Sequence, residues 1–166
     1  MTDPKLSEHL CVLDTIRPFD LPQVARLFSD PAVRSFLGGP LSPALAEQRA
    51  SELLTKSAPA KIWAIRPASS VGTSFAGIVV LDRHHDFEDV EVSYLLLPEH
   101  WGRGYARAAV HQVLAYAFDV AGNKRVLAET QTANTASIRL LERLGFRHLR
   151  QVTRFGAEQS IYAAEP

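Results

Sequence analysis

A β-favouring run, a pair of glycines and a helical pattern follow one another directly in the middle of this chain. Residues 90–97 are rich in residues that strands favour, and apolar positions at helical spacing begin at Ala106. Between them lies the run Trp101-Gly102-Arg103-Gly104-Tyr105-Ala106. The first N–H groups of a helix lack intrahelical partners, and the helix dipole adds positive charge there. This strand, turn and helix therefore predict a site for a phosphate-like anion.

The glycine turn differs from two familiar phosphate loops. A P-loop requires Gly-Lys-Ser/Thr where its helix begins, but Gly104 is followed by tyrosine and alanine. A dinucleotide-binding turn follows an early parallel strand, whereas this turn lies in mid-chain after strands that favour antiparallel pairing. Arg103 and Arg107 flank the turn, and two interpretations of them stay open: donors to phosphate oxygens, or solvated helix surface.

The pattern of the whole chain predicts an α+β fold with α/β layering, as one domain over residues 1–166. Strands are expected at residues 10–16, 62–65, 75–81, 90–97, 124–130, 146–155 and 159–163. Helices are expected from Asp20 through Phe28, from Asp30 to Gly38, at residues 42–57, from Ala106 to near Gly122, and at residues 135–144. Asp20 and Asp30 each stand before a proline in a first turn, so we expect their side chains to cap helices.

Charge and cysteine usage exclude several classes of protein. The chain has 18 basic and 18 acidic residues, so no global field attracts nucleic acid or an anionic membrane surface. The single Cys11 excludes an intrachain disulfide framework and a cysteine-rich zinc site, and it suits a reducing compartment. Residues 1–10 contain no long apolar run, which predicts neither a signal peptide nor a membrane anchor. We therefore expect a cytoplasmic protein.

Two histidines beside an acid, His84-His85-Asp86, raise the question of a metal site. Adjacent residues on a strand point to opposite faces, and no second pair of ligands stands at the usual spacing. We expect a solvated hairpin end and no metal.

Three stretches of the chain, in this order and spacing, resemble one superfamily. They are Glu91-Val92-Ser93-Tyr94-Leu95-Leu96-Leu97-Pro98, then Glu99-His100-Trp101-Gly102-Arg103-Gly104-Tyr105-Ala106, then residues 134–146, which begin Asn134-Thr135-Ala136-Ser137. They are similar to the GCN5-related N-acetyltransferases (GNAT). Trp101 stands where most members have Arg or Gln, and this departure resembles the RimJ/RimL-like branch.

The resemblance implies a GNAT fold, with a mixed, mostly antiparallel twisted sheet of about seven strands and about four to five helices. The sheet is expected to split like a V between its fourth and fifth strands, residues 90–97 and 124–130. Acetyl-CoA is the expected co-substrate in the split. The expected cofactor-binding residues are Leu95, Leu96, Leu97, Trp101, Gly102, Arg103, Gly104, Tyr105, Ala106, Arg107 and Asn134.

Acyl transfer to an amine requires a base, because an alkyl amine has a reference pKa of about 10.4 and is protonated at neutral pH. Glu91 is the candidate base. Its alternative interpretation is an exposed strand glutamate in an acidic stretch. A backbone N–H near Leu96 is expected to stabilise the oxyanion.

The departing thiolate requires an acid, and many superfamily members offer a tyrosine where this chain has Leu141. Ser137 lies one helical turn earlier and is the candidate acid, with a bond to its own helix backbone as the alternative. Asn134 is expected both to cap this helix and to bind the pantetheine or its phosphates. No cysteine lies near these motifs, so we expect direct transfer within a ternary complex.

Together these residues predict an acyl-CoA-dependent N-acetyltransferase acting on a primary amine, either a protein N-terminus or a small molecule. A catalytically silent acyl-CoA-binding module is the alternative, because the acid at the position of Leu141 is missing. A nucleotide-binding regulatory domain is the third interpretation. The acceptor walls are expected from residues 28–40 and the C-terminal strands. The sequence leaves a homodimer open and predicts no nucleic-acid or membrane partner.

Overall fold

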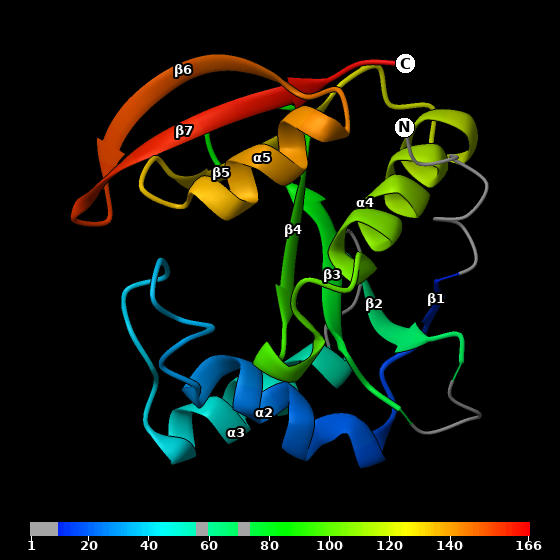
Figure 1. Cartoon of the computed structure of the whole chain (residues 1–166), viewed down its shortest axis with the longest axis vertical. Helices are drawn as coiled ribbons and strands as arrows, with labels where there is room; N and C mark the ends of the chain where they lie inside the picture. The colour runs from blue at the N-terminus through cyan, green and yellow to red at the C-terminus, as the bar shows by residue number, and fades with distance from the viewer. Residues whose placement is uncertain (1–9, 56–59, 70–73) are drawn as a thin grey trace.

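The computed structural model describes residues 10–55, 60–69 and 74–166, and its centre is one seven-stranded sheet (Figure 1). The strands lie in the order β1-β2-β3-β4-β5-β7-β6. Their bounds are β1 Cys11–Asp14, β2 Lys61–Pro67, β3 Gly77–Arg83, β4 Val90–Leu96, β5 Val126–Gln131, β6 Arg147–Arg154 and β7 Ala157–Ala164. All neighbouring strands are antiparallel except β4 and β5, which are parallel. The predicted mixed, mostly antiparallel sheet is confirmed.

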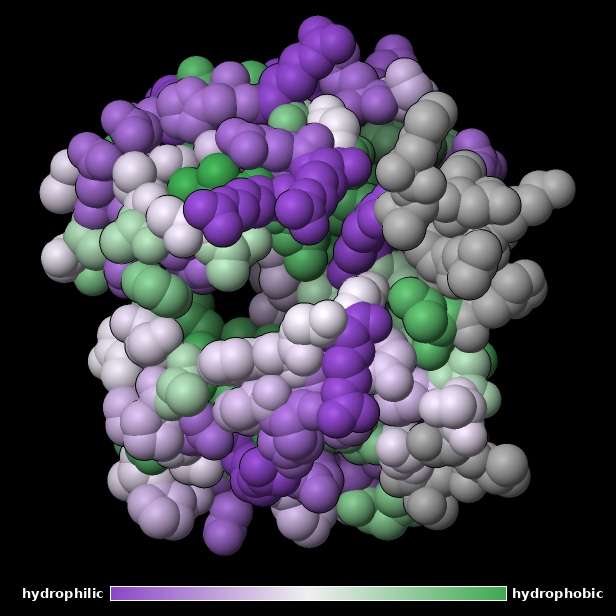
Figure 2. Space-filling model, viewed as in Figure 1, coloured by the Kyte–Doolittle hydropathy of each residue, from purple (hydrophilic) through white to green (hydrophobic). Residues whose placement is uncertain are grey.

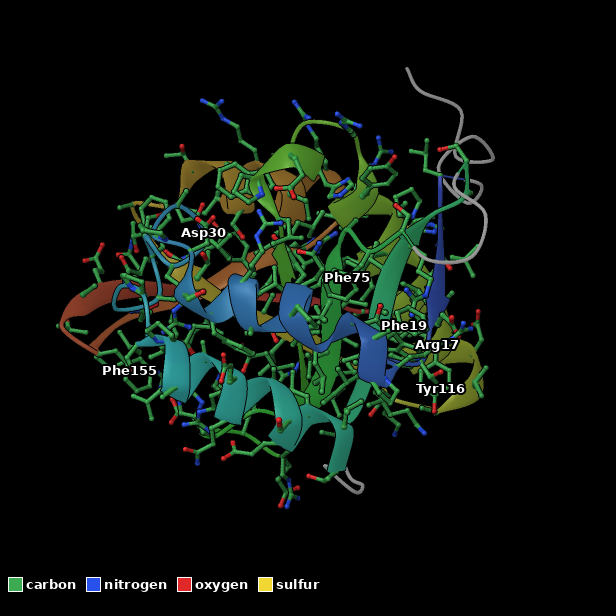
Figure 3. All side chains as sticks on the ribbon, turned by 90° about the horizontal axis from the view of Figure 1, so that it is seen from below. Arg17, Phe19, Asp30, Phe75, Tyr116 and Phe155 are labelled. Carbon is green, nitrogen blue, oxygen red and sulfur yellow. The ribbon has the colours of Figure 1, made fainter. Side chains whose placement is uncertain are left out.

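Four α-helices lie among the described residues: α2 Leu21–Ser29, α3 Pro43–Thr55, α4 Tyr105–Ala115 and α5 Thr135–Arg143. A π-helical turn, Tyr116–Val120, continues α4, and short 3-10 turns, Pro18–Asp20 and Pro98–His100, come shortly before α2 and α4. Figure 3 shows α2 and α3 side by side from below, with Phe19 near the start of α2 and Asp30 at its end. None of the helices in the described ranges is both long and apolar enough to cross a bilayer.

Strand alternation divides the core into two clusters, one on each face of the sheet. Val79 of β3 and Val92 of β4 pack with Val110 of α4. Ile78, the neighbour of Val79, belongs instead to the cluster that contains Leu27 of α2. Because side chains of a strand alternate between faces, odd-numbered residues of β4 lie on the α2 face and even-numbered ones on the α4 face.

The sheet opens between β4 and β5. Only two residue pairs join these strands, Val90 with Val126 and Glu91 with Leu127. Beyond Glu91, β4 continues toward α2 and α3, while β5 stays with β7 and β6 in the upper half of the molecule (Figure 1). The predicted V-shaped split between the fourth and fifth strands is therefore confirmed.

The helix predicted from Asp30 to Gly38 is wrong, because residues 31–38 form successive turns. The capping signal itself is real: Asp30 Oδ1 accepts hydrogen bonds from the N–H groups of Ala32 and Val33. The Arg34 side chain then binds the carbonyl groups of Leu37 and Gly39 and closes the segment into a compact loop. These side-chain bonds satisfy the backbone in turns, so residues 31–38 need no helix.

Asp20 has a role that differs from the predicted helix cap. Its carboxylate makes no capping bond to α2. It accepts from the Arg17 backbone N–H and pairs with Arg66 of β2, with an Nη2 to Oδ2 distance of 2.8 Å. Asp20 is 1% exposed, so this buried ion pair fastens the start of α2 to the sheet.

Two sequence predictions fall outside the described ranges. They are the absence of a leader, which concerns residues 1–9, and the end of the helix predicted at residues 42–57 beyond Thr55.

A glycine is required where β3 begins, beside the cleft strand. A Cβ on Gly77 would lie 2.1 Å from the Leu95 carbonyl oxygen and 2.8 Å from the Leu96 Cα. Both are backbone atoms in a paired strand, so they cannot move without disturbing the sheet.

We predict that Gly77→Ala lowers the free energy of unfolding by about 3 kcal/mol, the upper range for overpacking a core. Chemical denaturation followed by circular dichroism measures this. Gly122→Asn is the control: its backbone is left-handed with open space around it, and asparagine tolerates that conformation, so the expected loss is below about 1 kcal/mol. Equal losses in the two variants would show that the close approach to β4 is unimportant.

Candidate active site

The edge of β4 that faces the split is formed by backbone groups. The N–H of Leu97 donates to the Ala76 carbonyl beside β3, at 2.9 Å, so Leu97 points toward β3. Backbone N–H and C=O groups of successive strand residues point to opposite edges, so those of Leu96 point away from β3, into the gap, while its side chain packs in the core on the α4 face. Its carbonyl accepts a hydrogen bond of 2.8 Å from the Trp101 indole, which lies outside the sheet. Beyond Glu91, β4 therefore presents an unpaired edge to the split.

The glycine turn leads from this edge into α4. Gly102 and Gly104 have φ angles of +70° and +83°, left-handed values that favour glycine. Gly104 is the N-cap and supplies no capping side chain, so the amides of the first turn of α4 are not covered by one. Residues 101–104 are exposed. The structure thus has the glycine turn and the helix start that the sequence predicted at this position, and a helix start of this kind can bind an anion.

Glu91 lies at the vertex of the split and in an unusual electrostatic environment. Its side chain is 21% exposed, and the backbone N–H of Glu129 on β5 bonds its carboxylate. Burial, together with the charge of the Glu129 carboxylate, raises the pKa of Glu91 to about 7, although Arg154 opposes the shift. A carboxylate with this pKa can hold or release a proton near neutral pH.

A buried network beside Glu91 was not anticipated from the sequence. His84 Nε2 lies 3.1 Å from Glu129 Oε2 and 3.9 Å from Glu91 Oε2. Arg154 of β6 grips both oxygens of Glu129. Burial opposes ionisation of Glu129, but the hydrogen bond and charge of Arg154 hold its pKa below the usual range. The network therefore keeps a negative charge next to Glu91.

The arrangement of His84 and His85 corrects a premise of the sequence analysis. The two residues follow the end of β3, so they are not on opposite faces of a strand; their rings stack with centroids 4.6 Å apart. With Glu129 they form a cluster in which the potential ligand atoms lie within 4.8 Å of one another. However, the Asp86 N–H occupies His84 Nδ1, and both oxygens of the Glu129 carboxylate are already paired with Arg154. This bonding fits an ionic network better than a metal centre.

Burial lowers the pKa of His84 below its ordinary value, which keeps the imidazole neutral at pH 7. Because Nδ1 accepts from Asp86, the remaining proton is on Nε2 and points to Glu129.

Ser137 and Asn134 lie at the start of α5, as predicted. Asn134 is the N-cap, and its Oδ1 accepts from the Ser137 N–H at 3.2 Å, which confirms the capping part of that prediction. Ser137 Oγ lies 2.7 Å from Tyr94 Oη, so a hydroxyl pair links β4 to α5. Leu141 is 1% exposed and packs in the core.

Tyr94 has a polar contact that the sequence did not predict. It was interpreted as a core or cleft-wall aromatic, yet its hydroxyl is bonded to Ser137. Burial raises the pKa of Tyr94, which keeps the phenol protonated. Alternation along β4 already places Tyr94 opposite to Glu91, on the face where α5 carries Ser137.

A pocket of about 350 Å³ lies on the α2 face and includes Glu91. Figure 2 shows a deep hollow between the two halves of the molecule, in the region of the split. The pocket lining is Phe28, Leu53, Ile62, Ile78, Val80, Asp82, Arg83, Glu91, Ser93, Tyr94 and Leu95. Of the acceptor walls expected from the sequence, Phe28 alone is among these residues.

The fold and the glycine turn agree with comparisons to known proteins. Residues 11–147 match the family model described as an acetyltransferase (GNAT) domain. The chain is 41% identical over 56 residues to YoaA, an uncharacterized N-acetyltransferase of Bacillus subtilis. That alignment covers 34% of this chain and 32% of YoaA, so it spans about a third of each protein.

Solved structures show the same architecture. A GNAT-family acetyltransferase from Bacillus anthracis superposes with a TM-score of 0.80 at 19% identity, covering 94% of this chain and 95% of that one. Spermidine N-acetyltransferase from Vibrio cholerae, solved with CoA and spermine, gives a TM-score of 0.76 at 17% identity, with 94% and 95% coverage. At these identities the likeness concerns the fold alone.

We predict that Glu129→Gln lowers the pKa of Glu91 from about 7 toward its ordinary value of 4.5. The change removes a neighbouring negative charge, while Arg154, which also pairs with Asp86, keeps its favourable effect on the Glu91 carboxylate. Carbon-13 NMR of the glutamate carboxyl groups during a pH titration measures it. Glu47→Gln, which alters an exposed glutamate of α3, is expected to leave the titration unchanged.

The same shift makes stability depend on pH. Since the pKa of Glu91 in the folded chain exceeds 4.5, the folded state binds this proton more tightly than the unfolded chain does. Its contribution is full below about pH 4.5 and is lost as the pH rises through about 7. Denaturation of Glu91→Gln across this window should lack that component.

Proposed function

Because this chain belongs to the GNAT acetyltransferase family, we propose that it transfers an acetyl group from acetyl-CoA to a primary amine. One observation carries the proposal: the unpaired edge of β4 beyond Glu91 leads directly to the uncovered start of α4. An extended thiol arm can add to such an edge, while the pyrophosphate binds the helix amides. We place the protein in the RimJ/RimL-like branch on its Trp101 turn, and in the cytoplasm on its single Cys11.

The order of these groups along the chain determines where each part of the co-substrate lies in this proposal. Leu95, Leu96 and Leu97 lie along the pantetheine, and the pyrophosphate lies at residues 102–107, where Arg103 and Arg107 add charge-assisted bonds. Trp101 fixes the turn against the strand through its bond to the Leu96 carbonyl. Asn134 caps α5 and, in this proposal, also binds the thiol arm through its side-chain amide.

Glu91 is the general base in this proposal. It removes a proton from the bound ammonium group, which then attacks the thioester carbonyl as a neutral amine. The pKa of about 7 suits this step, because the carboxylate is ionised often enough to act and basic enough to accept. The Leu96 N–H points into the gap and stabilises the oxyanion that forms.

The hydroxyl pair of Tyr94 and Ser137 supplies the acid. As the carbon–nitrogen bond forms and the carbon–sulfur bond breaks, Ser137 donates a proton to the departing thiolate and Tyr94 replenishes Ser137. The second proton of the amine nitrogen, released as the amide forms, restores the Tyr94 hydroxyl through water, and Glu91 returns its proton to solvent. The two catalytic groups come from opposite faces of β4, with the base on the pocket side and the acid on the α5 side. No covalent enzyme intermediate is needed.

A silent acyl-CoA-binding module is the second candidate, favoured by one observation. The position that often carries the thiolate acid in the superfamily holds Leu141, which is buried in the core. Binding of CoA without acetyl transfer to any amine is the result that favours this alternative.

We predict that Gly104→Ala weakens CoA binding about tenfold, or 1.4 kcal/mol, because a Cβ crowds the amides that hold the pyrophosphate. Isothermal titration calorimetry with CoA measures it. Gly122→Ala is the matched control, since Gly122 has a similar left-handed backbone (φ +70°) away from the turn. CoA binding that is equally tight in both variants would place the pyrophosphate elsewhere.

We predict that Glu91→Gln lowers kcat/KM by about 10² to 10⁴, the usual contribution of a general base. In the unaltered enzyme, kcat/KM rises with pH through about 7, because the ionised carboxylate is the active form. Ser137→Ala lowers kcat with little change in KM. Steady-state kinetics between pH 5 and pH 9 tests each of these.

Glu158→Gln is the control for Glu91→Gln, because it removes an exposed carboxylate from β7. Its activity and pH profile are expected to match the unaltered enzyme. Full activity in both Glu91→Gln and Ser137→Ala would remove these residues from the mechanism.

A further inference from the structure

The floor of the pocket consists of three cross-strand pairs from β3 and β4. They are Asp82 with Glu91, Val80 with Ser93, and Ile78 with Leu95. Partners in an antiparallel pair lie on the same face of the sheet, so the pairs form successive rows on the α2 face. The rows change from two carboxylates to a mixed row and then to two aliphatic side chains.

Apolar walls rise over the second and third rows. Ile62 of β2 lies beside Val80 in the sheet. Phe28 of α2 and Leu53 of α3 complete this side. Phe28, Leu53, Val80 and Leu95 are partly buried at the margin of the α2 core cluster, so they offer apolar surface to the pocket.

The acidic groups of the pocket are confined to one end. Among its lining residues Asp82 and Glu91 are the only acids, and they form a single row. The aliphatic row lies four residues further along each strand, which corresponds to about 13 Å. An ammonium group can therefore pair with a carboxylate at the Glu91 end, which Arg83 also lines. A second cation one pocket length away would lie against apolar side chains without a partner, at a large desolvation cost.

We infer that the acceptor is a primary amine with an apolar substituent, whose ammonium group binds at Asp82 and Glu91 and whose aliphatic or aromatic part lies against Phe28 and Leu53. This rests on the proposed acetyl transfer and names its acceptor class. An ammonium group next to an apolar substituent is present in some small free amines and in a peptide whose first residue has an apolar side chain. A polyamine has further amino groups in place of such a substituent.

Acetyl-CoA turnover with a matched set of acceptors tests the inference. The set comprises leucinamide, glycinamide, 2-phenylethylamine, spermidine, and two peptides that differ only in leucine or glycine as the first residue. We expect kcat/KM for leucinamide to exceed that for glycinamide at least about tenfold, since a few methylene groups in an apolar pocket contribute that much. The peptide pair and the free amines then show which source the enzyme prefers.

Leu53→Gln gives a second readout that does not depend on total activity. It should reduce the ratio of kcat/KM for leucinamide to that for glycinamide at least about threefold, because a polar group then lines the apolar end. Leu54→Gln is the control, since Leu54 follows in α3, is 36% exposed and does not line the pocket. Its ratio should equal that of the unaltered enzyme.

The outcomes separate this inference from the function on which it rests. Turnover that favours spermidine or glycinamide, or a leucinamide preference that survives Leu53→Gln, overturns the acceptor class and leaves acetyl transfer intact. Absence of turnover with every amine overturns the proposed function, and the acceptor class with it.

Discussion

The parting of β4 from β5 is the structural feature on which the site depends. Two residue pairs hold the strands together, and the second of them contains Glu91. At that point the charge of Glu129 on β5 acts on the Glu91 carboxylate, so the two strands still interact through their side chains as they separate. Beyond this point the backbone N–H and C=O groups on this edge of β4 need hydrogen-bond partners other than β5. In an acetyltransferase the thiol arm of the co-substrate is a natural one.

The split also gives the proposed base and the proposed acid access to one carbonyl group. Along β4, Glu91 faces the pocket beneath α2, and Tyr94 faces α5 and Ser137. An intact sheet would keep these two faces apart by a layer of backbone. Because β5 diverges, groups from both faces can approach a molecule that lies in the gap. Strand alternation places a carboxylate on one face and a hydroxyl on the other within four residues.

Local signals were strong enough to predict most elements and the turn at Gly102 and Gly104, because cap residues, glycines and periodicity act over a few residues. The prediction for residues 31–38 was wrong because Asp30 and Arg34 satisfy the backbone in turns as well as they would in a helix. Asp20 was misread since its partner, Arg66, lies 46 residues away. The contacts of Glu129 and Arg154 with Glu91 likewise join distant strands, which no local pattern reveals.

The β6–β7 hairpin takes on a further importance through Arg154. This residue ends β6, next to Phe155, whose left-handed backbone (φ +53°) closes the hairpin, and its guanidinium holds Glu129 beside Glu91. The position of the hairpin tip therefore affects the pKa of Glu91. A substrate, a neighbouring molecule or a mutation that displaces the tip would change the pKa of Glu91 without contacting Glu91 itself.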